Sequence, residues 1–111
     1  MAPNLGLGNL VTFLDFNDFQ GLGRTSETHP HFMPMTDKVE SFGWEAAEVN
    51  GHDADAVFNA VAGRKGEKPF FLVCHTVKGK GVSFMENTVL WHYRCARGEE
   101  FDAALRELES L

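Results

Sequence analysis

The chain has 111 residues, of which 43% are hydrophobic and 23% are charged, and its formal net charge is −6. A chain of this length and composition is typical of one small globular domain. The acidic balance argues against nonspecific nucleic-acid binding, and no run approaches the roughly 18 consecutive apolar residues of a membrane span.

The cysteines and the N-terminal residues indicate the cellular compartment in which the protein is expected. Cys74 and Cys95 do not form a C-x-x-C pair, and two cysteines make no disulfide framework. The N-terminus lacks the basic region, apolar stretch and small-residue cleavage site of a secretory signal. We therefore expect a reducing, cytoplasmic location.

The first part of the chain predicts a strand, a long loop and a short helix. Residues 9–16 are almost continuously apolar, which predicts a strand buried on both faces of a parallel sheet. Residues 17–34 carry glycines and prolines and are expected to be loop, longer than the about 12–15 residues beyond which loops are usually functional or disordered. A helix is expected over residues 36–42, with Thr36 or Asp37 as its N-cap.

The second part of the chain predicts two more strands and two more helices. Residues 44–49 give a weak strand signal, and Asp53 can cap a helix over residues 54–62, whose apolar residues recur at helical spacing. Residues 69–77 predict a second strongly buried strand. After a glycine-rich basic stretch and an irregular segment, residues 99–111 form an amphipathic pattern with helical spacing.

This alternation predicts an α/β fold, a partial three-layer parallel sheet with flanking helices and right-handed crossovers. We treat residues 1–111 as a single partial domain. Only eight residues precede the first strand, so in the chain alone its edge and faces would be poorly covered. We therefore expect another chain, or a longer product, to cover this strand.

Polar residues follow the first strand, at the edge of the sheet where ligands bind in such folds. Asp15, Asn17, Asp18 and Gln20 lie there. Oxygen ligands suit Mg²⁺, and Asn17 could give an amide oxygen while the turn after it gives a backbone carbonyl. The alternative is an ordinary strand end with turn-forming side chains.

Two further groups could carry chemistry. Residues 78–81, Lys-Gly-Lys-Gly, place positive charge on a pliable backbone that can approach a diphosphate, although a flexible basic hairpin explains them equally well. His92, next to Trp91, could donate or accept a proton near neutral pH, or could be a packed core histidine. His29 and His31 lack further ligands at metal spacing, so zinc is not expected.

Taken in order, these pieces resemble the transketolase family. The residues that carry the resemblance are Asn9-Leu10-Val11, Asp15, Asn17, Gln20, Phe42-Gly43-Trp44, Val49-Asn50-Gly51-His52-Asp53, Lys68-Pro69, Thr76-Val77-Lys78-Gly79-Lys80-Gly81, Phe84-Met85-Glu86-Asn87 and Trp91-His92. They are similar to the N-terminal domain of these enzymes, which binds the diphosphate of thiamine diphosphate, and especially to the form split into two subunits. The resemblance covers residues 9–93.

The resemblance implies a role for each candidate residue. Asn17 would bind Mg²⁺ and touch the cofactor, and Phe19 would add its backbone carbonyl as a second metal ligand. Lys78 would lie beside the cofactor. His92, fourteen residues further along the chain, would be the catalytic residue that faces the reacting end of the cofactor and the substrate.

The chain also departs from the family pattern. The Gly-Asp-Gly motif that supplies the other side-chain metal ligand, and the substrate-binding histidines upstream, are absent. The glutamate that activates the cofactor belongs to a separate pyrimidine-binding domain. Tyr93 stands where the family often has glycine after the Trp-His pair. We therefore expect this chain to bind the cofactor weakly by itself.

The resemblance implies a component of a thiamine-diphosphate- and Mg²⁺-dependent transferase that moves a two-carbon ketol unit between sugar phosphates. Its partner would be a pyrimidine-binding transketolase subunit or a second copy of the chain. One alternative is an acyloin-type transferase that acts on another sugar-like substrate. The other is a non-catalytic interaction or regulatory module that keeps the half-domain fold.

Overall fold

The computed structural model describes residues 1–21 and 23–111, and its internal contacts divide them into two compact units. The sheet unit comprises residues 1–16 and 29–76, and the hairpin unit comprises residues 17–28 and 77–111. The sheet unit contains the parallel sheet and the helices that flank it. The hairpin unit contains every residue for which the sequence predicts a role in catalysis or in cofactor or metal binding.

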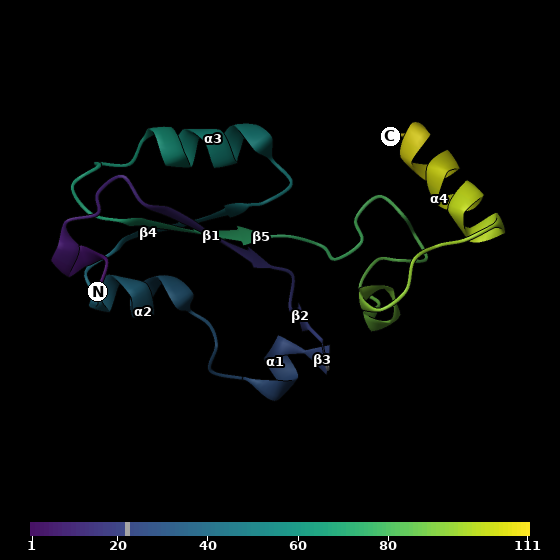
Figure 1. The fold of residues 1–111 in the computed structure, drawn as a ribbon, viewed down its shortest axis with the longest axis horizontal. Helices are drawn as coiled ribbons and strands as arrows, with labels where there is room; N and C mark the ends of the chain where they lie inside the picture. The colour runs from purple at the N-terminus through teal and green to yellow at the C-terminus, as the bar shows by residue number, and fades with distance from the viewer. Residues whose placement is uncertain (22) are drawn as a thin grey trace. The chain divides into compact units, whose positions relative to one another are not determined.

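The sheet unit is built on three parallel strands, which confirms the predicted α/β class. These are β1 (Val11–Phe16), β4 (Glu45–Asn50) and β5 (Phe70–His75), in the order β1-β5-β4. Helix α3 (Ala54–Ala62) lies on one side of the sheet and α2 (Met35–Ser41) on the other, so the unit has three layers (Figure 1). A short 3-10 helix, η1 (Pro3–Leu5), precedes β1.

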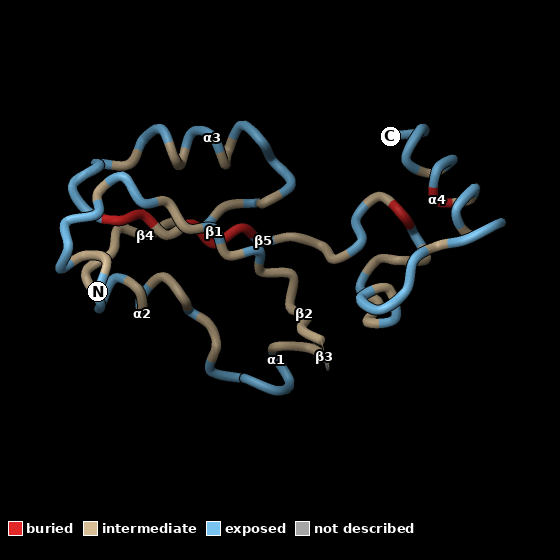
Figure 2. The backbone as a smooth tube through the Cα atoms, viewed as in Figure 1, coloured by how far each residue is buried: buried red, intermediate tan, exposed pale blue. Residues whose placement is uncertain are grey.

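The core of the sheet unit lies on β5, because β5 is paired on both edges. Phe70, Leu72 and Cys74 point to one face and pack with Val57 and Val61 of α3. Figure 2 shows β5 as the most buried stretch of this unit. The near-continuous apolar sequence of this strand therefore reflects its central position.

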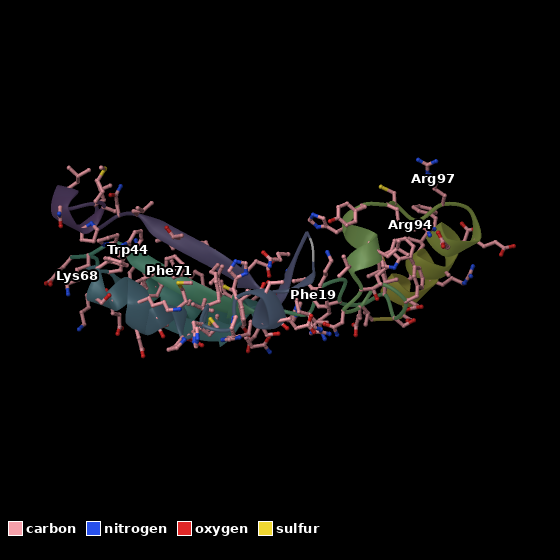
Figure 3. All side chains as sticks on the ribbon, turned by 90° about the horizontal axis from the view of Figure 1, so that it is seen from below. Phe19, Trp44, Lys68, Phe71, Arg94 and Arg97 are labelled. Carbon is pink, nitrogen blue, oxygen red and sulfur yellow. The ribbon has the colours of Figure 1, made fainter. Side chains whose placement is uncertain are left out.

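The opposite face of the sheet carries an aromatic contact at the start of the strands. Trp44 meets Phe71 edge-on, with ring centroids 5.9 Å apart (Figure 3). Edge-to-face pairs of this kind stabilise a fold by roughly 0.5–1.5 kcal/mol beyond the contribution of the apolar area that they bury. This pair joins the residue before β4 to the central strand.

The prediction that the first strand is buried on both faces is wrong for this chain. β1 pairs only with β5 among the described strands, and its Phe13 side chain is 54% exposed. The apolar pattern of β1 is that of a central strand, while its observed position is an edge. The accompanying prediction, that the strand would be poorly covered here, is confirmed.

Two local predictions also need correction. Helix α2 begins at Met35, and its N-cap is Pro34, whose side chain cannot cap. Thr36 lies within the helix, and its hydroxyl donates to Glu48 on β4 over 3.1 Å. The segment 17–34 is not all loop, since it contains β2 (Phe19–Gln20), β3 (Gly23–Arg24) and α1 (Thr25–Thr28). These elements are too short to leave a periodic signal in the sequence.

The hairpin unit combines the antiparallel β2–β3 pair with a C-terminal segment. This segment contains a 3-10 helix, η2 (Val89–His92), and α4 (Glu99–Glu109). Ala104 is the buried residue of α4, and the larger apolar residues on the helix are partly exposed. None of the helices in the described part of the chain has the length and apolar character needed to cross a membrane.

Helix α4 is tied to the bend that follows β5 by a carboxylate. The Ser83 backbone amide and hydroxyl both donate to Glu107, the hydroxyl over 2.8 Å. These bonds lower the pKa of Glu107 below its ordinary value of 4.5. The ionised form is therefore the one that holds the helix.

The two cysteines have different environments. Cys74 is 8% exposed in the centre of the sheet, whereas Cys95 is exposed in the segment before α4, and both are free thiols. Burial raises the pKa of the Cys74 thiol, and the Asp15 carboxylate adds to this effect.

We expect Leu72→Ala to lower the free energy of unfolding by about 2–5 kcal/mol, because the side chain is fully buried on β5 and its loss leaves a cavity. The matched control is Phe58→Ala on α3, where the ring is 69% exposed and the change should stay within about 0.5 kcal/mol. Urea unfolding of the two variants measures the difference. Equal losses in both would contradict the placement of the core.

The Glu107 carboxylate should make the docking of α4 depend on pH. Its folded-state pKa is lowered, so its stabilising effect is complete above about pH 4.5 and is lost as the pH falls through the folded-state pKa. We expect the protection factor of the Ser83 amide to fall in that acidic range. In Glu107→Gln protection should be low at every pH, and a variant that keeps the wild-type profile would refute this assignment.

Candidate functional site

The candidate site begins where β1 and β5 end side by side. The Thr76 amide donates to the Phe16 carbonyl over 3.1 Å, and the Thr76 hydroxyl bonds to the Asp15 carboxylate. Parallel strands are about 4.8 Å apart, so the segments that leave them start as neighbours. Asn17 and Val77 are the first residues of those two segments.

The segment after β1 opens with a tight turn. The Asn17 side-chain oxygen accepts a hydrogen bond of 2.9 Å from the Phe19 amide. Asp18, between them, has a left-handed backbone with φ of 60°. The bond from Phe19 orients the Asn17 amide and leaves its oxygen a second lone pair for another partner.

The Asp18 carboxylate is held by three donors from the following elements. The Ser26 amide donates over 2.8 Å, the Ser26 hydroxyl over 2.9 Å and the Arg24 guanidinium over 3.1 Å. The hydrogen bonds from Ser26, followed by that from Arg24, lower the pKa of Asp18. The first turn of the segment is thereby fastened to β3 and α1.

The segment after β5 is a closed bend rather than a flexible basic hairpin. The Asn87 amide donates to the Lys78 carbonyl over 2.9 Å, and the Glu86 carboxylate accepts from the Gly81 amide over 3.2 Å. Gly79 has φ of +75°, and a Cβ there would lie 2.6 Å from the Met85 carbonyl oxygen. The glycine is therefore required by the close approach of two backbone segments.

His92 is the last residue of η2, and its position is set by its neighbours. The Trp91 indole donates to the Phe84 carbonyl over 3.0 Å, and the Arg94 guanidinium lies 4.6 Å from the centre of the Trp91 ring. Trp91 is thus held at its indole nitrogen and over its ring. His92 itself is exposed rather than packed in a core, and Tyr93 meets it edge-on with centroids 4.9 Å apart.

The hairpin that carries the Asn17 turn approaches His92. A Cβ built on Gly21 would lie 3.3 Å from the Tyr93 hydroxyl and 3.7 Å from His92 Nε2. A side chain at Gly21 would be tight against the Tyr93 hydroxyl, whereas His92 lies at ordinary contact distance. This approach links the predicted metal-binding turn to the predicted catalytic histidine within one unit.

The four predicted site residues thus lie in one unit, and the structure adds residues that the sequence did not single out. Asn17 and Phe19 share one turn, Lys78 lies in the closed bend, and His92 lies beside Gly21. The roles of Gly21 and Arg24 were missed because neither follows a periodic pattern. A sequence signal existed only for the Glu86-Asn87 pair, which belongs to the resemblance and which closes the bend.

The residues after β4 have the structural role that the sequence predicts. The Asn50 side chain accepts from the His52 amide over 3.0 Å, and the Asp53 carboxylate caps α3 by accepting from the Ala56 amide over 2.9 Å. These contacts form a turn and a helix cap. They leave no reason to assign this group to the site.

The donor set at the Asn17 turn fits a hard cation in part. An amide oxygen and a backbone carbonyl are ligands of the kind that Mg²⁺ prefers, and two of them leave most of an octahedron to other groups. Across residues 1–21 and 23–111, no three histidine, cysteine, aspartate or glutamate side chains gather as a metal-binding group. By itself the turn therefore offers two oxygen ligands to a cation.

Comparison with known proteins gives one family. The family model for the transketolase thiamine diphosphate binding domain matches residues 1–108. A 6-deoxy-6-sulfo-D-fructose transketolase subunit from Clostridium sp. is 38% identical over 93% of this chain and 38% of its own length. An apulose-4-phosphate transketolase subunit from Phocaeicola vulgatus is 36% identical over 92% of this chain and 37% of its own length. The chain thus spans less than two fifths of the length of these relatives.

Solved structures agree with this comparison. A transketolase variant from Pichia stipitis, in complex with fructose 6-phosphate, has a TM-score of 0.83 and 26% identity over 97% of this chain and 16% of its own. The transketolase of Campylobacter jejuni shares the fold with a TM-score of 0.73 and 23% identity, over 80% of this chain and 14% of its own. Family model, relatives and fold agree, and the chain belongs to the transketolase family, in the part that forms the thiamine diphosphate binding domain.

Proposed function

We propose that the chain is the diphosphate-binding component of a transketolase-like transferase that moves a two-carbon ketol unit between sugar phosphates. The observation that carries this proposal is the approach of the Asn17 hairpin to His92 at Gly21. The proposed oxygen ligands of Asn17 and Phe19 and the imidazole of His92 therefore belong to one compact unit. A non-catalytic module would have no physical need for this combination.

Each of the proposed site residues has a separate role. The Asn17 amide oxygen and the Phe19 carbonyl hold Mg²⁺, and Lys78 offsets the negative charge of the diphosphate. When bound, thiamine diphosphate supplies the carbon nucleophile that adds to the ketose carbonyl. His92 orients the substrate and holds or moves a proton at its imidazole.

The substrate is a sugar with an anionic group. The residues directly after His92 line a pocket of about 380 Å³. They are Tyr93, Arg94, Cys95 and Arg97. Arg97 has no ion-pair partner among the described residues and projects away from the ribbon (Figure 3). Guanidinium groups bind phosphate and sulfonate oxygens well, and the names of the two relatives contain a sulfosugar and a sugar phosphate.

The working enzyme contains more than this chain. The relatives are named as transketolase subunits. We propose that residues 1–111 form one partial domain that operates with a pyrimidine-binding subunit or with a second copy of the chain. A cytoplasmic location fits the two unpaired cysteines of the sequence. With one side-chain metal ligand on this chain, affinity for the cofactor should be low without the partner.

The test is a titration of the chain with thiamine diphosphate and Mg²⁺ by calorimetry and by ³¹P NMR of the diphosphate. We expect weak, Mg²⁺-dependent binding that is lost in Asn17→Ala and reduced in Lys78→Met. Asn59→Ala is the matched control, because Asn59 is exposed on α3 in the sheet unit. Micromolar binding without any partner would contradict the incomplete site, and unchanged binding in Asn17→Ala would contradict the metal assignment.

A further inference from the structure

Asp18 lies between the two proposed ligand residues, and its backbone conformation sets the relative orientation of the Asn17 side chain and the Phe19 backbone. Its φ of 60° is in the left-handed region, which residues other than glycine adopt at a cost of about 1 kcal/mol or more. This conformation allows Asn17 to accept the Phe19 amide. Contacts with the surrounding residues must therefore offset the cost of this conformation.

The side chain of Asp18 makes the contacts that hold it. Its carboxylate accepts two hydrogen bonds from Ser26 and one from Arg24, while its carbonyl accepts the Thr25 amide over 2.8 Å. All of these partners lie on β3 and α1. The carboxylate therefore points toward β3 and α1, where it accepts three hydrogen bonds, and not toward a ligand.

Arg24 fixes the other end of the turn. The same guanidinium that pairs with Asp18 lies 4.5 Å from the centre of the Phe19 ring. Phe19 and Arg24 also face each other across the β2–β3 pair. One side chain therefore holds both the carboxylate of Asp18 and the ring of the residue whose carbonyl is the proposed ligand.

We propose that Asp18 and Arg24 are positioning residues, which clamp the turn so that the Asn17 amide oxygen and the Phe19 carbonyl face one divalent cation. This inference rests on the proposed function. Neither residue is a ligand, and each acts through the turn. Groups that orient metal ligands typically change metal affinity by about 10–100-fold when they are removed.

The experiment uses the full chain, ¹⁵N-labelled, with manganese(II) chloride as the probe, because paramagnetic broadening detects weak binding. We expect selective broadening of the Asn17 side-chain and Phe19 signals in the unmodified chain. In Arg24→Ala, the midpoint of broadening should move to about 10-fold higher Mn²⁺ concentration. Exchange of the Phe19 amide should also become faster in the metal-free protein, a readout that needs no activity.

Three further variants separate the causes. Arg24→Lys keeps the charge but loses the planar group over Phe19, so we expect an intermediate effect. Asp18→Asn should show the same metal-free loosening of Phe19 as Arg24→Ala, which a ligand that did not position the turn would not show. Arg106→Ala on α4 is the matched control and should behave as the unmodified chain. If Arg24→Ala unfolds the hairpin unit, Arg24→Lys and Asp18→Asn carry the test.

The outcomes distinguish this inference from the proposed function. If Asn17→Ala abolishes broadening while Arg24→Ala changes neither the midpoint nor the exchange of Phe19, the clamp is wrong and the metal site stands. If Asp18→Asn weakens Mn²⁺ binding without loosening Phe19, Asp18 is a ligand and the clamp is again wrong. If the unmodified chain shows no broadening at Asn17 and Phe19, the clamp is overturned, while the proposed function is judged by the titration with thiamine diphosphate and Mg²⁺.

Discussion

The site depends on the parallel pairing of β1 with β5. Because Thr76 bonds to both Asp15 and Phe16, the two strands end in register, and the segments that follow leave the sheet together. Asn17 and Lys78 are 61 residues apart in sequence, but their segments start from adjacent strand ends. A shift of one strand along the other would separate the starts of these segments, however well each folded locally.

Beyond the sheet, backbone hydrogen bonds give the loops their shape. The bend after β5 is closed by Asn87 on Lys78 and by Glu86 on Gly81, and Trp91 is tied to the Phe84 carbonyl. The buried side chains of this unit are small, so polar contacts supply much of its definition. A loop defined in this way can present backbone amides and carbonyls to a ligand at fixed positions.

Much of the fold could be predicted from the sequence. The apolar run at β5 and the helical spacing with an Asp53 cap at α3 gave the correct elements, because each is a strong local signal. The poor cover of β1 was expected, but the order β1-β5-β4 could not be predicted, since strand order is a property of the whole sheet. The short β2–β3 pair was missed because two-residue strands have no periodicity, and its contacts come from single side chains such as Arg24.

The site residues were identified by resemblance, and the structure explains why spacing alone was ambiguous. Asn17 does form a turn, as the simpler interpretation held, and the same turn presents the oxygen that the functional interpretation needs. The Lys78 segment likewise is neither a P-loop nor a free hairpin but a bend closed locally by Glu86 and Asn87. One arrangement is compatible with both interpretations, so sequence pattern could not separate them.

The contrast between the two cysteines gives the protein a convenient chemical handle. Cys74 is enclosed within the sheet and its burial disfavours the thiolate, which is the form that reacts with alkylating reagents. Cys95 is open to solvent and stands three residues after His92. A maleimide fluorophore or spin label should therefore attach at one position, and its signal would report on the neighbourhood of the histidine while a ligand or a second protein chain is added.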